Sequence, residues 1–181
     1  MLKNTTAQYG AIQKFLHWLM AVLIIGMLIF GYFLGNFGIA AVYNLHKLVG
    51  LLLLLLVLLR IMWICWCKRP ALPKSVSRFE RILAYSVEGL LYFSMLLMPI
   101  FGWMATTLAG RVPVFLGYRL NMPFIPLNPA LAHQVMGLHE DLAVIIIVLI
   151  VLHVLGALKH YVIDKDGVVE RMLPSSSRHS K

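Results

Sequence analysis

One stretch near the C-terminal end, from Gly137 to Tyr161, limits what this chain can fold into more than any other feature. It reads GLHEDLAVIIIVLIVLHVLGALKHY and contains an unbroken apolar run from Leu142 to Leu152. A helix rises about 1.5 Å per residue, so the run with its apolar flanks is long enough to cross one bilayer. The stretch therefore predicts a helix that is surrounded by lipid rather than by water.

His139 and His153 lie on either side of this apolar run. They are 14 residues apart in the sequence, which at about 3.6 residues per turn returns them to nearly the same helix face. The rise between them is about 21 Å. This spacing predicts two stacked sites, one near each membrane surface. His160, seven residues further along, lies on the same stripe at the water boundary.

The composition extends this prediction to the rest of the chain. Of its 181 residues, 61% are hydrophobic and only 13% are charged, and a soluble core of this length could not bury so much apolar surface. The sequence therefore predicts an all-α fold, an integral membrane four-helix bundle that forms a single domain over residues 1–181. The spans are expected at about 12–34, 42–66, 82–109 and 132–160, followed by a cytoplasmic tail at 161–181.

Basic residues indicate the orientation of the spans. With the N-terminus inside, thirteen of the 16 lysines and arginines fall on the cytoplasmic side, and only Lys47, Arg111 and Arg119 fall outside. Both termini should therefore be cytoplasmic. The net charge of +9 reflects mainly this topology, with anionic lipid headgroups as the expected partner and no nucleic acid. Cys65 and Cys67 then lie on the reducing side, where we expect free thiols.

Four histidines fall inside the predicted spans, and histidine is costly in hydrocarbon unless it is paired, solvated or bound to metal. The first span runs outward and the fourth runs inward, so His17 and His153 both lie at inner depth. His46 and His139 each begin an inward-running span and share the outer depth. A single such histidine would be interpreted as a hydrogen-bonded bundle residue. Pairing of all four by depth favours two bis-histidine metal sites instead.

The chemistry of these pairs favours haem over zinc. A zinc site needs three or four ligands at one level, often with cysteine or carboxylate, whereas the sequence supplies two histidines at each. A haem is a flat apolar macrocycle that fits between helices, and its iron takes two axial imidazoles. Its propionates would turn to the surface, where Arg60 or Lys47 are placed to meet them. Gly50, one turn after His46, would leave space beside that histidine.

Other polar residues within or beside the spans keep two interpretations each. Arg60 either extends to the headgroups or pairs with an acidic group among the helices. Glu88 is a functional candidate by its depth, or it reaches the inner interface. Glu140 and Asp141 either accept protons at the outer site or, as we prefer, occupy the first turn of a helix, where the dipole favours acids. His133 points about 120° away from the ligand stripe and is expected in a loop or interface.

The loop between the third and fourth spans and the C-terminal tail carry further expectations. Residues 110–129 alternate proline, glycine and aromatic residues, which predicts an ordered lid on the outer membrane surface. Together with Lys47, the two arginines of this loop make the outer face cationic, which either attracts a small anion or meets lipid phosphates. In the tail, residues 165–172 suit a short amphipathic helix, and residues 175–181 are expected to be disordered.

Four motifs carry a resemblance to a known family. They are FLHW around His17, LHKLVG around His46, the GLHEDLA…LH pair of His139 and His153, and the closing KD…RMLP. In these motifs the chain resembles the bacterial cytochrome b561 family, which is related to the cytochrome b subunits of membrane hydrogenases and formate dehydrogenases. The likeness covers essentially the whole chain, with the same span count, ligand order and 14-residue spacing.

The resemblance implies two b-type haems in a multi-pass protein of the bacterial inner membrane, with His17 and His153 on one iron and His46 and His139 on the other. These are the pairs that the topology predicts. Both irons would then be six-coordinate, so a substrate would react at a haem edge rather than on iron.

Family members that act alone are described as oxidising superoxide at the outer face and reducing ubiquinone. By this likeness, the cationic surface near Lys47, Arg111 and Arg119 would attract superoxide. His160 resembles a family histidine near the place of the quinone headgroup, where its imidazole would serve as a hydrogen-bond donor or proton source. An interfacial histidine beside Tyr161 is the equal alternative.

Three functions are consistent with the sequence. The leading one is a self-contained superoxide:quinone oxidoreductase. The second is a cytochrome b subunit that passes electrons between a docked redox partner and the quinone pool. The third is a membrane scaffold without haem. The small extramembrane mass favours the first over the second, because it leaves little surface for docking.

Overall fold

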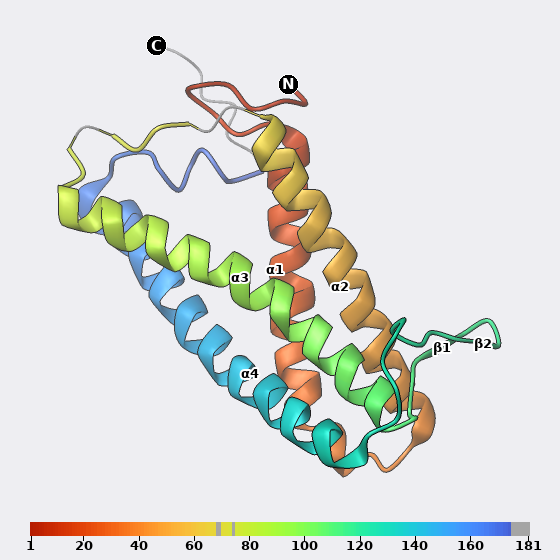
Figure 1. Ribbon diagram of the computed structural model, residues 1–181. Coiled ribbons are helices and arrows are strands. Elements are labelled where there is room, and N and C mark those ends of the chain that lie inside the picture. The colour runs from red at the N-terminus through yellow and green to blue at the C-terminus, as the bar shows by residue number, and fades with distance from the viewer. Residues whose placement is uncertain (68–69, 74, 175–181) are drawn as a thin grey trace.

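The chain folds into four long helices, as the computed structural model shows for residues 1–67, 70–73 and 75–174 (Figure 1). Each helix is long and apolar enough to cross a membrane. The prediction of an all-α membrane protein with four spanning helices is therefore confirmed. The helices are α1 (Ala11–Tyr32), α2 (Ala40–Trp66), α3 (Arg78–Leu108) and α4 (Pro129–Leu158).

Short elements connect and extend these helices. A 3-10 turn, η1 (Leu34–Asn36), joins α1 to α2, and a π-helical turn, η2 (Lys159–Asp164), continues α4. The N-terminus and the chain that follows η2 lie at one end of the bundle, called here the terminal end, and a small β-hairpin lies at the opposite end, called the hairpin end (Figure 1). Successive helices therefore alternate in direction between the two ends.

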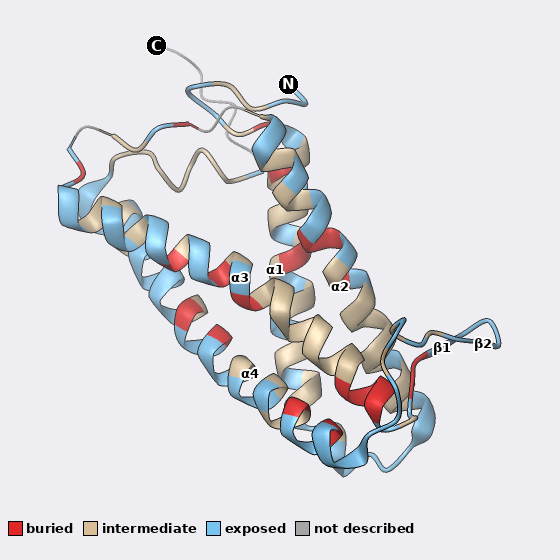
Figure 2. Cartoon of the chain, in the orientation of Figure 1, coloured by how far each residue is buried: buried red, intermediate tan, exposed pale blue. Residues whose placement is uncertain are grey.

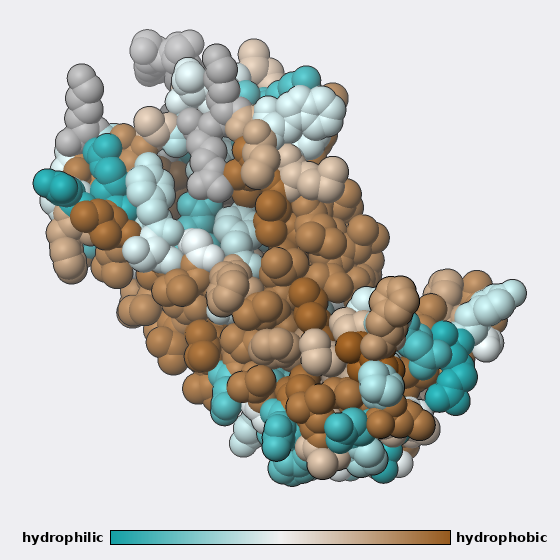
Figure 3. Space-filling view, in the orientation of Figure 1, coloured by the Kyte–Doolittle hydropathy of each residue, from teal (hydrophilic) through white to brown (hydrophobic). Residues whose placement is uncertain are grey.

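The outer surface of the bundle is apolar. In each candidate span, between 6% and 17% of the residues in its most apolar window are buried, and the buried positions gather where helices meet (Figure 2). On the face shown in Figure 3, a broad apolar belt covers the helices and hydrophilic residues gather toward the two ends. Such a surface needs lipid around it, because apolar side chains in water carry a free-energy penalty.

Local sequence signals set where two of the helices begin. Ser77 caps α3 in a capping box, since its side chain accepts from the backbone N–H of Glu80 while the Glu80 carboxylate accepts from the backbone N–H of Ser77. Asn128 caps α4 by accepting from the backbone N–H of Leu131, and Pro129 occupies the first turn. Both arrangements satisfy backbone donors that a helix start leaves without partners.

The helices pack in two unequal halves. α3 and α4 contact each other most extensively, while α2 contacts α1 on one side and α3 on the other. The largest cluster centres on Met20 of α1 with Leu53, Leu56 and Val57 of α2, and side chains of α3 pack against it. Further clusters join α3 to α4 near the hairpin end and near the middle of α4. α1 and α2 therefore contact each other directly, and α3 joins this pair to α4.

The loop between α3 and α4 is structured, as expected. Strands β1 (Val114–Phe115) and β2 (Tyr118–Arg119) pair antiparallel through a two-residue turn. The turn residues, Leu116 and Gly117, have φ values of 49° and 84°, the left-handed pair that a type I′ hairpin turn requires. That this loop lies on the membrane surface stays a prediction.

The tail after α4 differs from the sequence-based expectation. The predicted amphipathic helix over 165–172 is wrong, because the chain forms turns there. Lys165 and Gly167 have φ values of 50° and 79°, and a right-handed helix cannot pass through left-handed residues. Asp166 stabilises the turn by accepting a hydrogen bond from the backbone N–H of Val168 at 3.1 Å.

The tail then crosses the terminal end of the bundle and is tied to it by three side chains that donate to backbone carbonyls. These bonds are Lys14 to Leu173 at 2.8 Å, Trp18 to Met172 at 3.0 Å, and Arg171 to Ala71 at 2.8 Å. Residues 68–69, 74 and 175–181 lie outside the described residues. The expected disorder of 175–181 falls there, as do Lys68, Arg69, Lys74, Arg178, His179 and Lys181.

We expect Asn44 to hold the hairpin against α2. Its side-chain amide donates to the carbonyl of Val114 at 2.8 Å and accepts from the Val114 N–H at 2.7 Å. Asn44→Ala removes both bonds, worth about 1 kcal/mol each, so tryptic cleavage at Arg119 in the detergent-purified protein should speed up roughly tenfold or more. Asn121→Ala, at an exposed loop position, is the control. Equal cleavage rates in the two variants would contradict this role.

Candidate functional site

Two histidine pairs lie between the helices, one toward each end. His17, His46 and His139 are half-buried, and His153 is exposed. At the hairpin end, the ring centroids of His46 on α2 and His139 on α4 are 6.3 Å apart, with the ring planes at 75°. At the terminal end, those of His17 on α1 and His153 on α4 are 6.2 Å apart, with the planes at 61°. The structure therefore brings together the residues that the depth argument paired. Their role as metal ligands stays a prediction.

The separation of the rings suits a metal ion between them. A metal–imidazole bond is about 2 Å long and the ring centroid lies about 1 Å beyond the bonded nitrogen, so two opposed axial histidines have centroids roughly 6 Å apart. Both observed separations, 6.2 and 6.3 Å, match this value. Edge-to-face packing of two rings covers the same range of centroid separations, so the identity of the donors, two imidazoles at each level, is what points to a metal.

The ring of His139 is held in the form that binds metal. Its Nδ1 lies 2.8 Å from the backbone carbonyl of Met98 on α3. A carbonyl only accepts, so Nδ1 carries the proton and Nε2 keeps its lone pair. Metal-binding histidines commonly donate their other N–H in this way. The ring partner, His46, has a buried Nδ1 with no hydrogen-bond partner among the described residues.

Two glycines make room for the hairpin-end pair. A Cβ placed on Gly102 of α3 would lie 3.0 Å from the ring of His139, and one on Gly31 of α1 would lie 3.2 Å from that of His46. The space expected at Gly50 is present, because a Cβ there meets nothing within 4 Å and Gly50 lines the same cavity as His46. Nothing in the sequence pattern identified Gly102, since it lies on a different helix from either histidine.

An apolar cavity adjoins the hairpin-end pair. Its volume is about 70 Å³, and side chains of all four helices line it together with His46 and His139. Gly50, Met95 and Pro99 are among the lining residues. Apolar walls with a few polar groups are the lining that flat organic cofactors need between helices. The residues present therefore fit a haem.

The terminal-end pair is arranged differently, because Arg60 of α2 contacts His17. The Arg60 guanidinium donates to Nδ1 of His17 at 3.0 Å and lies over the ring of Tyr92, 5.3 Å from its centroid. A guanidinium only donates, so Nδ1 accepts and Nε2 carries the proton. A protonated nitrogen cannot bind metal. Binding through Nε2 of His17 therefore requires Arg60 to move away, which frees its charge for an anionic group.

Several other predicted residues can now be placed. Glu88 and Arg60 both act electrostatically on His153, so each lies near the terminal-end pair. His133 is exposed on α4 and belongs to neither pair. The preferred placement of Glu140 and Asp141 in a first helical turn is wrong, because α4 begins at Pro129 and no acidic residue lies in its first turn. Cys65 and Cys67 are free thiols, as expected.

The predicted cations of the hairpin end gather around one short segment. Lys47 donates to the backbone carbonyl of Arg111 at 2.6 Å, and Arg119 donates to that of Gly110 at 3.0 Å. The Arg111 and Arg119 residues are exposed. Three positive charges near one surface attract anions before any specific contact forms.

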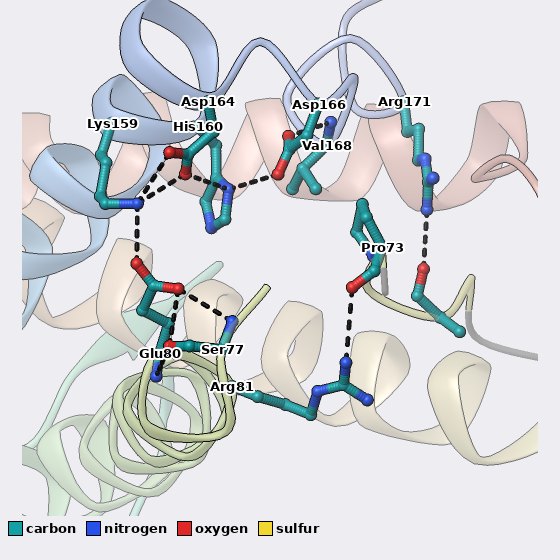
Figure 4. A network of polar contacts seen from close by, with 11 residues as sticks. Pro73, Ser77, Glu80, Arg81, Lys159, His160, Asp164, Asp166, Val168 and Arg171 are labelled. Carbon is teal, nitrogen blue, oxygen red and sulfur yellow. Dashed lines mark hydrogen bonds and ion pairs between the residues drawn. The ribbon is translucent and has the colours of Figure 1, made fainter. Parts of the chain in front are cut away.

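A polar network surrounds His160 at the terminal end (Figure 4). Its Nδ1 lies 2.7 Å from the Asp166 carboxylate and 3.3 Å from that of Asp164. Lys159 in turn binds Asp164 at 2.6 Å and Glu80 of α3 at 2.7 Å. His160, Asp164 and Asp166 are close enough to share a metal ion, but the Lys159 ammonium already occupies the Asp164 carboxylate and opposes a second cation. No role was expected for these acids from the sequence alone.

The fold and the paired histidines define a class, membrane helical bundles that hold a redox metal group between their helices. The model of one family, prokaryotic cytochrome b561, matches residues 8–175. The chain is 32% identical to "Cytochrome b561 homolog 2" of Escherichia coli (strain K12), over 96% of this chain and 95% of that protein. It is 33% identical to "Cytochrome b561 homolog 1" of the same organism over 47% and 48% of the two chains.

The chain therefore belongs to the prokaryotic cytochrome b561 family. The resemblance that the motifs indicated is confirmed. Membership makes the protein a membrane electron-transfer protein of an oxidoreductase type, and it implies the binding of haem b.

We expect Gly102→Ala to lower the haem content of the purified protein. The added methyl group would lie 3.0 Å from the His139 ring and would push it out of line, which should reduce the haem-to-protein ratio by roughly half because only one histidine pair is disturbed. Gly89→Ala on the same helix is the matched control, since its Cβ meets nothing within 4 Å. The same haem content in both variants would show that His139 needs no such clearance.

Proposed function

We propose that this chain binds two haems b and carries electrons across the bacterial inner membrane, oxidising superoxide at the hairpin end and reducing ubiquinone at the terminal end. The observation that carries the proposal is the presence of two histidine pairs with axial spacing, 6.3 Å at the hairpin end and 6.2 Å at the terminal end. The two levels are about 21 Å apart along α4, so the pairs lie toward opposite membrane surfaces.

In this proposal His46 and His139 hold the haem of the hairpin end, and His17 and His153 hold that of the terminal end. A bound haem iron alternates between two oxidation states and so supplies one-electron transfer. Arg60, once released from His17, has its guanidinium within reach of the terminal-end site, where a propionate is the anionic group to meet. The hairpin end faces the periplasm and the terminal end faces the cytoplasm.

The remaining candidate residues act on the two substrates. Lys47, Arg111 and Arg119 raise the local concentration of superoxide, which is an anion. His160, exposed over only 13% of its side chain, delivers protons to the reduced quinone. Two superoxide anions, one quinone and two protons give two molecules of dioxygen and one quinol. His17, His46 and His139 are half-buried, and His153 is exposed on the apolar surface of α4, which lipid would cover.

The test is a turnover assay of the isolated protein. Superoxide is generated enzymatically in the presence of the purified, haem-loaded protein and ubiquinone-1, and quinol is measured by its absorbance. We expect quinol formation well above the rate without protein. Turnover at the background rate in a preparation with full haem content would favour the alternative, a cytochrome b subunit that exchanges electrons with a docked redox protein.

Replacement of single ligands tests the number of haems and their assignment. His139→Ala and His153→Ala should each lose roughly half of the bound haem, because each removes one axial ligand from a different pair. His133→Ala, at an exposed position on the same helix, should keep all of it. The pyridine haemochrome assay measures the loss. Full haem content in either ligand variant would refute the assigned pairs.

Removing charge at the hairpin end should slow the reaction with superoxide. In the double variant Arg111→Gln/Arg119→Gln, we expect the rate of haem reduction by superoxide to fall several-fold at low ionic strength, and the difference from wild type to shrink in about 0.5 M salt as screening grows. Stopped-flow absorbance gives the rates. Lys3→Gln, a charge at the terminal end, is the control. A loss that does not depend on salt would contradict electrostatic attraction.

A further inference from the structure

If the proposed function holds, a second residue beside His160 takes part in quinone reduction. His160 lies in η2, seven residues beyond His153, at the point where α4 leaves the apolar belt. Its side chain is 13% exposed, and that of Asp166 is 7% exposed. A nearly buried carboxylate against a nearly buried imidazole is costly to assemble unless the two groups satisfy each other.

The hydrogen bond between them fixes which ring nitrogen carries the proton. Nδ1 of His160 lies 2.7 Å from Oδ2 of Asp166. An ionised carboxylate only accepts, so Nδ1–H donates and Nε2 is the nitrogen left for another partner. Figure 4 shows the Nε2 side of the His160 ring directed away from both carboxylates. The ring is therefore oriented with Nε2 away from the acids that contact Nδ1.

Asp166 is held in place independently of His160. Its other oxygen, Oδ1, accepts from the backbone N–H of Val168 at 3.1 Å. The left-handed residues Lys165 and Gly167 on either side set the turn that points the carboxylate back toward η2. The tail that follows is anchored to α1 through Trp18. The carboxylate can thus act as a fixed reference for the imidazole.

Asp164 contacts His160 less closely than Asp166 does. Its oxygens lie 2.9 and 2.6 Å from the Lys159 ammonium, and 3.3 Å separates Oδ2 from Nδ1 of His160. Lys159 also binds Glu80 of α3. The nearby Arg81 and Arg171 donate to backbone carbonyls of the loop before α3, as Figure 4 shows. Among these charged groups, Asp166 is the one in direct short contact with the ring.

We propose that Asp166 is a positioning residue that keeps His160 in its Nδ1–H form, so that Nε2 delivers protons to quinone bound beside it. Each proton leaves Nε2 of the charged ring for a quinone oxygen, and the neutral ring regains one from water at the same nitrogen. Two such transfers accompany the two electrons that two superoxide anions supply. Asp166 keeps its charge throughout and touches no substrate.

Asp166→Asn tests the proposal. The amide can keep its oxygen on the Val168 N–H and presents NH2 to Nδ1, which then has to accept, so the proton moves to Nε2 and the ring adopts the wrong form. With the haems reduced beforehand, we expect reoxidation by ubiquinone-1 to be at least about tenfold slower at pH 7.5, with haem content and the KM for quinone unchanged. The variant's rate should rise as the pH falls, because protons then come directly from solution.

Two further variants separate positioning from a structural role. Asp164→Asn should keep a rate within about threefold of wild type, because Lys159 is its main partner. Asp166→Glu, which restores a carboxylate, should recover part of the lost rate. An equal loss in Asp164→Asn and Asp166→Asn would overturn the assignment, since it would reflect the charge of the network as a whole. Loss of haem in Asp166→Asn would do the same.

Wild type distinguishes failure of this inference from failure of the proposed function. If ubiquinone-1 does not reoxidise the reduced haems of wild type, the proposed function fails and the role of Asp166 fails with it. If wild type is reoxidised rapidly and Asp166→Asn matches it in both rate and pH profile, only the role of Asp166 is refuted.

Discussion

Two imidazoles on α4 need polar partners within an apolar bundle. This need organises the rest of the structure. His139 and His153 lie on one face of this helix, at levels about 21 Å apart, and each ring lies near that of a histidine on another helix. Lipid offers no hydrogen bonds, so other helices must supply the partners. α2 provides His46 at one level and α1 provides His17 at the other. The packing of α3 against both α2 and α4 keeps these helices in register.

The two levels are not equivalent, although the same residue type forms both. At the hairpin end, the Met98 carbonyl sets the His139 tautomer and glycines leave room for the rings, as a metal-binding histidine would require. At the terminal end, Arg60 occupies Nδ1 of His17, and this contact would have to break before Nε2 could bind metal. In the proposed arrangement of two haems, a positive charge near one haem would stabilise its reduced state, so Arg60 would also make the two potentials differ.

Polar chemistry is confined to the two ends, and each end suits a different reactant. The hairpin end gathers cations on a short loop and presents them to solvent. The terminal end holds a network in which acids, Lys159 and His160 satisfy one another. An anion that donates an electron fits the first, and a neutral quinone that needs protons fits the second. In the proposed function, the apolar belt between them would keep water from the electron route.

The sequence by itself determined the four spanning helices and which histidines share a level. Span length, helical period and alternating direction are properties of position along the chain, so they can be read without knowing how helices rotate against one another. Only the tertiary structure decided three contacts. They are the hydrogen bond from Arg60 to His17, the close approach of Gly102 to the His139 ring, and the hydrogen bond from His160 to Asp166. These depend on helix rotation and on left-handed backbone at Lys165, which no periodicity in the sequence encodes.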